Sequence, residues 1–345
     1  METEKSITIQ NNDDLEIISS RIKSEDFTKL IIGDTMQSFP IFEGLHSINS
    51  LEIVSEQINS IPEEAFMKNQ NIKNVKLSQS ITTIANIPFY GSSISQINLE
   101  NVNSIGESAF CDCINLQSAD LQKIQSLDSS CFANTSLIEV NLSTDFMILP
   151  SYAFCNCFKL TTFISKCNSF GEYSFCNCTS LKIFKYDFKD TWEIHSTALI
   201  STAIEELEIN SNAMRNDAFS KLPIKKLIIY SSSPYFNGGK YDGLIYYQNL
   251  KTIEFTRDTY SIALRNMNIE EIITPDDPDF SCQIDIAGCP KLKNLPNGID
   301  YVRYAGDLPE IESVDLTHCK RIYRNSFFNC PKLKKSLDGE IMKWI

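Results

Sequence analysis

The stretch Ile105-Gly-Glu-Ser-Ala-Phe110-Cys-Asp-Cys113-Ile-Asn-Leu116 returns twice in nearly the same form. It reappears as Leu149-Pro-Ser-Tyr-Ala-Phe154-Cys-Asn-Cys157-Phe-Lys-Leu160 and as Phe170-Gly-Glu-Tyr-Ser-Phe175-Cys-Asn-Cys178-Thr-Ser-Leu181. A fixed period of about 20 to 29 residues is typical of a solenoid, in which each repeat forms one turn of an elongated coil. This repeat, rather than the length of the chain, therefore predicts the fold.

The central Phe of the motif is the anchor of each repeat. Phe42 and Phe327 are the first and last clear anchors, and 13 steps of about 22 residues separate them. If the repeats stack, the anchors pile into one continuous hydrophobic core. The positions between the two ends fall at Phe66, Phe89, Phe110, Phe132, Phe154, Phe175, Ala198, Phe219, Leu244, Leu264, Ile286 and Ala305.

A short alternating segment follows each anchor, and alternation with a period of two predicts a strand with one buried face. Because equivalent strands recur about every 22 residues, they are expected to be parallel and about 4.8 Å apart. The segment around the anchor itself is too short for a full helix and predicts a 3₁₀ turn or a single helical turn. The predicted strands include Leu51–Ile53, Val75–Leu77, Ile97–Leu99, Val140–Leu142, Leu207–Ile209, Leu227–Ile229, Ile253–Phe255 and Val314–Leu316.

The chain is expected to form one solenoid with short ends. We predict an N-terminal cap over residues 1–20, about 14 repeats over residues 21–338, and a C-terminal tail over residues 339–345. The repeats are irregular between residues 231 and 310, where turn-forming residues interrupt the pattern.

The repeats resemble the BspA-like leucine-rich repeats, whose pattern is Ile-x-x-x-Ala-Phe-x-x-Cys-x-x-Leu-x-x-Ile-x-Leu. The match is close over residues 105–121 and 149–164, and the resemblance covers about residues 21 to 338. It implies a right-handed, curved α/β-type solenoid with a parallel sheet on the concave face and short turns on the convex face. It also implies protein binding, and relatives include cell-surface adhesins and antigens of bacteria and protists.

Charge and composition limit the kinds of partner and the cellular compartments to be considered. The net charge of −13 disfavours nucleic acid as a partner, because phosphate binding needs clustered Lys and Arg. The first residues, Met1-Glu-Thr-Glu, do not resemble a signal peptide, and no apolar run is long enough to span a membrane. We expect a monomeric protein of the cytoplasm, with display at the cell surface as the alternative that the resemblance suggests.

The 12 cysteines are the strongest candidates for chemistry, and five of them share one column of the repeat: Cys113, Cys157, Cys178, Cys289 and Cys330. We interpret this column as a buried core ladder, because free Cys packs as a small hydrophobic residue. Two alternatives stay open: a metal site, which the Cys-x-Cys spacing fits poorly, and disulfides between neighbouring turns, such as Cys155 with Cys176. No cofactor motif and no catalytic constellation is present in the sequence, so we expect neither a cofactor nor an enzyme.

Candidate binding residues lie on the exposed side of the predicted strands, where the residues between the apolar pairs form one mixed column. Apolar residues enter this column mainly between residues 164 and 275, where we place a protein-contact patch, although such residues could instead pack the sheet. A loop over residues 231–243 is a second candidate, with simple replacement of a repeat segment as its alternative. The candidates are Ile164, Lys185, Glu208, Ile228, Tyr230 and Glu254 in the column and its surroundings, and Tyr235, Phe236 and Tyr241 in the loop.

Overall fold

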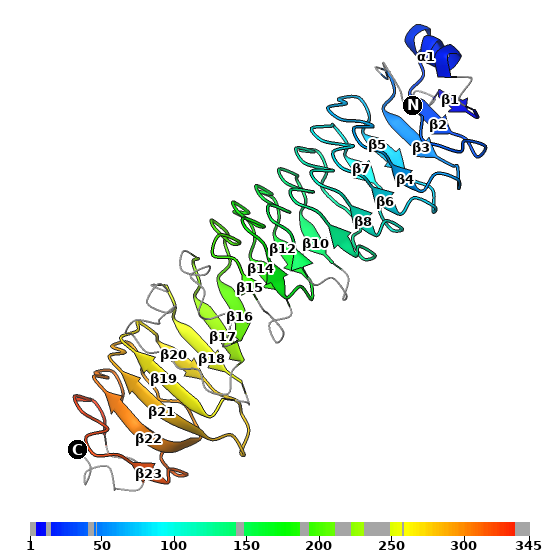
Figure 1. The fold of residues 1–345 in the computed structure, drawn as a ribbon. Helices are drawn as coiled ribbons and strands as arrows, with labels where there is room; N and C mark the ends of the chain where they lie inside the picture. Colours follow the sequence, from blue (N-terminus) through cyan, green and yellow to red (C-terminus); the bar gives the residue numbers. More distant parts are fainter. Residues whose placement is uncertain are drawn as a thin grey trace. The chain divides into compact units, whose positions relative to one another are not determined.

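The computed structural model describes residues 5–11, 15–40, 45, 47–142, 148–186, 193–210, 222–230, 249–256 and 259–334. It falls into two compact units, one formed by residues 1–187 and 197–203 and the other by residues 188–196 and 204–345. Each unit is a parallel β-solenoid, as the fold class predicted (Figure 1). The predicted boundaries of the cap, array and tail stay predictions, and the boundary at residue 20 falls within helix α1 (Leu15–Ser24).

Two ladders of parallel strands run through the first unit. The first strand ladder contains the predicted alternating segments of this unit and begins earlier, with a strand inside the predicted cap. Its neighbours pair without a register shift. It comprises β1 (Ser6–Ile9), β2 (Lys29–Ile32), β3 (Ser50–Ile53), β5 (Asn74–Lys76) and β7 (Gln96–Ile97), and then β10 (Glu139–Asn141), β12 (Thr162–Ile164) and β14 (Ile183–Lys185).

The second strand ladder was not expected from the sequence. It is formed by the aliphatic or aromatic residue five places before each anchor, together with the residue that precedes it. Strands of two residues carry no alternating pattern, so only their stacking reveals them. They are β4 (Ser60–Ile61), β6 (Thr83–Ile84), β8 (Ser104–Ile105), β9 (Ser126–Leu127), β11 (Ile148–Leu149) and β13 (Ser169–Phe170).

The second unit repeats this arrangement with longer strands. Its first strand ladder consists of β16 (Glu206–Asn210), β17 (Lys226–Tyr230), β18 (Thr252–Phe255) and β20 (Glu271–Ile273). Its second strand ladder contains β19 (Ser261–Arg265), β21 (Cys282–Ala287), β22 (Ile299–Gly306) and β23 (Arg321–Ile322), and β15 (Glu193–Ile194) also belongs to this unit. Leu264, Ile286 and Ala305 are register partners there, so these weak anchors are confirmed.

The anchors of the first unit form one stack. From Phe66 to Phe175 the ring centroids of successive anchors lie 5.2–5.7 Å apart and the rings are stacked. All six anchors in this run are buried, and burying one Phe is worth roughly 1.5–3 kcal/mol relative to exposure. This Phe stack confirms the predicted core. Phe42, Phe219 and Leu244 lie outside the described residues.

The anchor predicted at Ala198 was wrong by one position. The N–H of Phe154 donates to Ser174, the residue before the next anchor, and the N–H of Phe175 donates to Ala198. Ala198 therefore occupies the small position of the motif, and Leu199 is the anchor. Leu199 is fully buried, and it keeps the core continuous although Phe has been replaced.

The turns around the anchors are not helical, contrary to the prediction. The residues two before and two after Phe132, Ser130 and Asn134, have positive φ angles of 58° and 57°, and the same pattern surrounds the other Phe anchors of the Phe stack. A residue in the left-handed region breaks a right-handed helix. The amides of Ser130, Phe132 and Asn134 instead donate to carbonyls of the next turn, at 2.8–3.1 Å.

One predicted strand, Val314–Leu316, is not formed. Only Ser313 pairs there, in an isolated bridge with Asn294. The Asp315 carboxylate accepts hydrogen bonds from the amide of Thr317 at 2.9 Å and from its hydroxyl at 2.5 Å. A side chain bonded to its own backbone two residues on forms a turn, which competes with strand pairing.

Candidate protein-binding faces

The outward side of β3, β5 and β7 presents two columns of polar side chains. Leu51 and Val75 point into the core, and the residues on either side of them point outward. Because the strands pair in register, equivalent residues line up across the sheet. One column holds Ser50, Asn74 and Gln96, and the other holds Glu52, Lys76 and Asn98.

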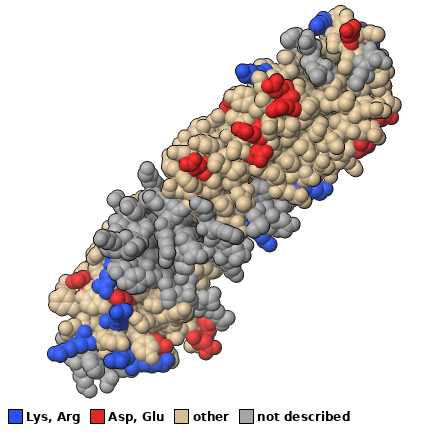
Figure 2. Space-filling model, in the orientation of Figure 1, with Lys and Arg blue, Asp and Glu red and all other residues tan. Residues whose placement is uncertain are grey.

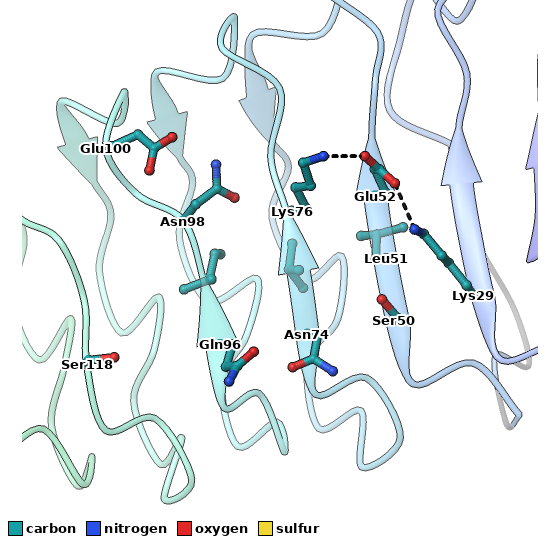
Figure 3. Close-up of a pocket in the computed structure, with 12 residues that line it drawn as sticks. Lys29, Ser50, Leu51, Glu52, Asn74, Lys76, Gln96, Asn98, Glu100 and Ser118 are labelled. Atoms are coloured by element: carbon teal, nitrogen blue, oxygen red, sulfur yellow. Dashed lines mark hydrogen bonds and ion pairs between the residues drawn. The ribbon is translucent and has the colours of Figure 1, made fainter. Parts of the chain in front are cut away.

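A shallow hollow of about 520 Å³ lies over these columns (Figure 3). Its lining is mostly polar and includes both charged and uncharged side chains, and the column of Ser50, Asn74 and Gln96 carries no charge. Of the three apolar residues that line the hollow, Ile97 is half-buried, whereas the side chains of Leu51 and Val75 are buried beneath the columns. The remaining lining residues are Lys29, Glu52, Lys76, Asn98, Glu100 and Ser118.

Glu52 fixes the charges at one side of the hollow. Its carboxylate oxygens lie 2.7 Å from Lys76 Nζ and 2.9 Å from Lys29 Nζ, so one anion joins three neighbouring strands (Figure 3). Hydrogen bonds from Lys76 and Lys29 lower the pKa of Glu52. The carboxylate therefore stays ionised at neutral pH and holds both ammonium groups against the sheet.

Asn98 has a structural role in the same row. Its side-chain amide accepts a hydrogen bond from the Leu77 amide at 2.6 Å and donates to the Leu77 carbonyl at 3.1 Å. These bonds continue the pairing of β5 and β7 beyond the last strand residues. Asn98 is therefore a scaffold residue, whereas Asn74 and Gln96 leave exposed amides for a partner.

The structure brings Ile164 and Lys185 together on β12 and β14, where they are register partners. Lys185 is exposed and Ile164 is half-buried. Beside them, Ile183 is 48% exposed although it lies within a strand. This part of the face therefore offers more apolar surface than the sequence column indicated.

In the second unit, Glu208, Ile228 and Glu254 form one row across β16, β17 and β18. Ile228 is only 8% exposed, because β17 is an inner strand and both neighbours in the row carry longer side chains. For Ile228 the structure thus favours the alternative of sheet packing. Burial raises the pKa of the Tyr230 hydroxyl, and the negative charges of Glu208 and Glu254 add to this effect.

An ion pair crosses the same sheet one row away. Lys226 Nζ lies 2.7 Å from a Glu254 carboxylate oxygen and 3.9 Å from one of Glu206. The hydrogen bond to Glu254 raises the pKa of Lys226. The three loop candidates, Tyr235, Phe236 and Tyr241, lie outside the described residues, so their role stays a prediction.

The sequence analysis missed two Arg–Tyr contacts in the second unit, one between β19 and β22 and the other at β23. Arg265 lies over the Tyr304 ring, 5.1 Å from its centroid, and Arg321 lies 4.5 Å from the centroid of Tyr323. Two register irregularities between β21 and β22 add extra residues to β22, and such bulges redirect side chains. The sequence feature that could have indicated these contacts is the repetition of Arg and Tyr in Tyr301-Val-Arg-Tyr304 and again in Arg321-Ile-Tyr-Arg324.

Charge gathers at this end of the second unit. Residues 316–334 contain five Lys or Arg and neither Asp nor Glu. Figure 2 shows the basic side chains grouped there on the visible face. Arg and Tyr are enriched where proteins contact one another, so this cluster is a further candidate surface.

The cysteine column is part of the core, as predicted, except at its end. Cys113, Cys157, Cys178 and Cys289 are buried, whereas Cys330 is half-buried. The thiols of Cys113, Cys157 and Cys178 donate to the carbonyl of the preceding anchor, at 3.0–3.2 Å. Burial raises the pKa of Cys157 to about 11 and that of Cys113 to about 12, so both are protonated at neutral pH.

Metal ligation and membrane insertion find no support in the residues that the structure describes. Among them, no three His, Cys, Asp or Glu side chains are grouped closely enough to hold a metal ion. Helix α1, the helix found in the described ranges, has 10 residues and is too short to cross a bilayer.

Comparison with known proteins identifies the repeat. A family model for the BspA type leucine rich repeat region matches six copies over residues 35–161 and 125–225. No curated protein matches the sequence. A leucine-rich repeat protein from Bacteroides ovatus is 16% identical, with a TM-score of 0.41, over 81% of this chain and 82% of its own.

Two further solved structures are similar at the same low level. A leucine rich cell surface protein from Faecalibacterium prausnitzii is 15% identical over 97% of this chain and 91% of its own, with a TM-score of 0.33. The pneumococcal vaccine antigen PcpA is 14% identical over 90% of this chain and 73% of its own, with a TM-score of 0.32.

Proposed function

Because the chain belongs to the BspA-type leucine-rich repeat family, we propose that it is a non-catalytic scaffold that binds a protein partner. The partner occupies the outward side of the first strand ladder. The observation that carries this proposal is the hollow over β3, β5 and β7, which is lined by two in-register columns of polar side chains.

The chemistry of the hollow fits a polypeptide better than a small metabolite. Small-molecule sites are concave, mostly apolar and nearly enclosed. This hollow is shallow and is lined by the exposed amides of Asn74 and Gln96 with the hydroxyl of Ser50. Such groups pair with backbone N–H and C=O groups of a partner. The half-buried Ile97 adds a small apolar contact.

Stacked turns also keep the face rigid. Binding therefore costs little conformational entropy on this side, because the outward residues lie on strands fixed by inter-turn hydrogen bonds. Extended faces of this kind are the surfaces that solenoid proteins use for binding.

One pair of matched substitutions tests the location of the face. Gln96→Arg places a long charged side chain in the hollow, whereas Gln125→Arg makes the same change at an exposed residue beside β9 of the second strand ladder. The full chain is immobilised, and proteins captured from a lysate of the source cells are quantified. We expect at least a tenfold loss of specific partners with Gln96→Arg and no loss with Gln125→Arg. Equal recovery by the two variants would contradict the proposed face.

Charge reversals extend the test to the other strands of the first strand ladder. Lys185→Glu changes the face beside Ile164, and Glu208→Lys changes the row that contains Ile228. Loss of capture with one reversal but not the other assigns the partner to one unit. Unchanged capture in both removes these two rows from the binding face.

A second candidate function is display at a cell surface as an adhesin or antigen. The family favours it, and a fold-related protein is described as a cell surface protein. Protease treatment of intact cells tests it. Loss of the protein, while a cytosolic marker is preserved, supports display, and protection of both contradicts it.

Three N-glycosylation sequons occur in the sequence, and they are poor evidence for that location: Asn134-Thr-Ser136, Asn141-Leu-Ser143 and Asn177-Cys-Thr179. Asn134 Nδ2 donates to Asp112 at 2.6 Å, and Asn177 Nδ2 donates to Asn156 at 2.9 Å. A glycan would replace these inter-turn hydrogen bonds. Asn141 is exposed on β10, so among the three sequons it is the acceptor that the fold leaves open.

A further inference from the structure

Cys155 and Cys176 occupy equivalent positions in two neighbouring turns. Each follows an anchor directly, and the two anchors, Phe154 and Phe175, are stacked with centroids 5.7 Å apart. The adjacent rings of Tyr152 and Tyr173 are stacked at 5.1 Å. The backbone between them is also paired, since the Asn156 amide donates to the Cys176 carbonyl at 2.7 Å.

This stacking brings the two thiols into contact. Neighbouring turns of the solenoid are about 4.8 Å apart, which lies within the Cα–Cα range of disulfides, about 4.4–6.8 Å. The side chains of Cys155 and Cys176 are hydrogen-bonded to each other. Both residues are half-buried, so a small reagent can reach them from the turn surface.

The neighbouring columns provide a contrast within the same turns. Cys157 and Cys178 are also in adjacent turns, but both are fully buried and each thiol donates to a backbone carbonyl. Cys111 lies in the same column as Cys155, but Ala133 takes the position between them. Cys155 and Cys176 are therefore the partially accessible cysteine neighbours of this region.

We propose that Cys155 and Cys176 form a thiol–disulfide exchange site, whose substrate is a small-molecule disulfide and whose product is a disulfide that links the two turns. One thiolate attacks the small disulfide, forming a mixed disulfide and releasing one thiol. The second protein thiolate then attacks the mixed disulfide and releases the other thiol. The protein loses two hydrogens, and the small disulfide is reduced to two thiols.

The exchange site is independent of the proposed binding face, because it lies on the turns around the Phe stack rather than on the first strand ladder. It closes a loop of about 20 residues, and such a link stabilises the fold by restricting the unfolded chain. The link forms in an oxidising compartment and is absent in a reducing one. The redox state of this pair therefore reports where the chain resides.

Trypsin cleavage of the full chain makes the link measurable. Cleavage after Lys123, Lys159, Lys166 and Lys182 places Cys155 in peptide 124–159 and Cys176 in peptide 167–182. The folded protein is incubated with excess oxidised glutathione at pH 8.5, alkylated, digested and analysed by mass spectrometry. We expect the two peptides to be joined, with a loss of two hydrogens.

Single variants distinguish the pair from its buried neighbours. Cys155→Ser and Cys176→Ser should each abolish the joined species, and the remaining cysteine should carry glutathione. Cys157→Ser and Cys178→Ser are the matched controls and should leave the joining unchanged. Oxidised wild type should melt at a higher temperature than reduced wild type, and this difference should vanish in Cys155→Ser.

Three results would overturn the proposal. One is glutathione on Cys155 and Cys176 together without a link between them. Another is a link that survives Cys155→Ser but disappears in Cys157→Ser. The third is the absence of any link while a synthetic peptide with two cysteines oxidises under the same conditions.

Discussion

At the scale of single residues, each turn places one large side chain in the core and satisfies the backbone around it. The Phe supplies the apolar area, and the residue three places later supplies a hydrogen bond. In three turns that residue is Cys113, Cys157 or Cys178, whose thiol donates to the carbonyl of the preceding anchor. Thr135 fills the same position and donates to the Phe132 carbonyl of its own turn at 2.9 Å. This position therefore requires a small side chain that can donate a hydrogen bond, and both Cys and Thr meet that requirement.

The Phe stack should be far more sensitive to truncation than the exposed aromatic residues. Phe132→Ala leaves a cavity between the rings of Phe110 and Phe154, so we expect a loss of roughly 3–5 kcal/mol in the free energy of unfolding. Phe158→Ala is the control, because Phe158 is 56% exposed and should change stability by less than about 0.5 kcal/mol. Urea denaturation followed by circular dichroism measures both. Equal effects would contradict a core built on the Phe stack.

Stability should fall in alkali because buried thiols must ionise. Burial raises the pKa of Cys157 from its ordinary value of 9.0 to about 11 in the folded protein. The stabilisation that the protonated Cys157 thiol provides is complete below pH 9 and is lost as pH rises from 9 through 11. Each such thiol adds a slope of about 1.4 kcal/mol per pH unit, so Cys157→Ser should reduce the slope by that amount. Identical slopes in the two proteins, measured by denaturation at several pH values, would show that Cys157 already ionises normally when folded.

At the scale of elements, the turns around the anchors are linked to one another by backbone hydrogen bonds, as the strands are. Left-handed residues on both sides of an anchor direct alternate amides toward the next turn. Asn is frequent two places after the anchor, because it tolerates this conformation. Its side-chain amide also donates to the equivalent residue of the preceding turn, as Asn134 does to Asp112. Three inter-turn ladders, two of strands and one of turns, thus surround the Phe stack.

The same substitution should have opposite effects in a turn and in a strand. Ser130 has a φ of 58°, so Ser130→Gly relieves backbone strain in the folded protein. Ser126→Gly in β9 relieves no such strain and destabilises the fold, because Gly raises the conformational entropy of the unfolded chain. We expect Ser130→Gly to be more stable than Ser126→Gly by at least about 1 kcal/mol. Thermal denaturation of the two variants measures this difference. A deficit for Ser130→Gly would contradict the left-handed turn.

The sequence predicted the elements whose pattern is carried by side-chain size and missed those set by the backbone. The Phe stack was predictable because a large ring recurs at a fixed spacing. Leu199 was missed because no large aromatic ring marks the anchor of this turn. Only the hydrogen bond from the Phe175 amide to the Ala198 carbonyl fixes the register. Val314–Leu316 has the pattern of a strand, but Asp315 closes a turn there. Half-burial of the candidate face could be predicted, whereas the burial of Ile228 depends on its neighbours across the sheet.

At the scale of the whole chain, the negative charge is unevenly distributed. Residues 1–187 contain 12 Lys or Arg and 22 Asp or Glu, so they account for −10 of the net charge of −13. The Arg–Tyr contacts of β19, β22 and β23 lie in the other unit. A partner of the hollow over β3, β5 and β7 is therefore expected to be basic, and its association should weaken as salt is added.

Covalent labelling of lysines in the captured complex tests the central claim most directly. Lys76 stands on the proposed face, and its side chain is 73% exposed, whereas Lys68 and Lys123 are exposed beside the turns and the second strand ladder. Brief acetylation followed by mass spectrometry compares the free and bound chain. A binding face on the first strand ladder predicts protection of Lys76 by the partner, with Lys68 and Lys123 labelled as before. Unchanged labelling of Lys76, together with protection of Lys68 or Lys123, would contradict it.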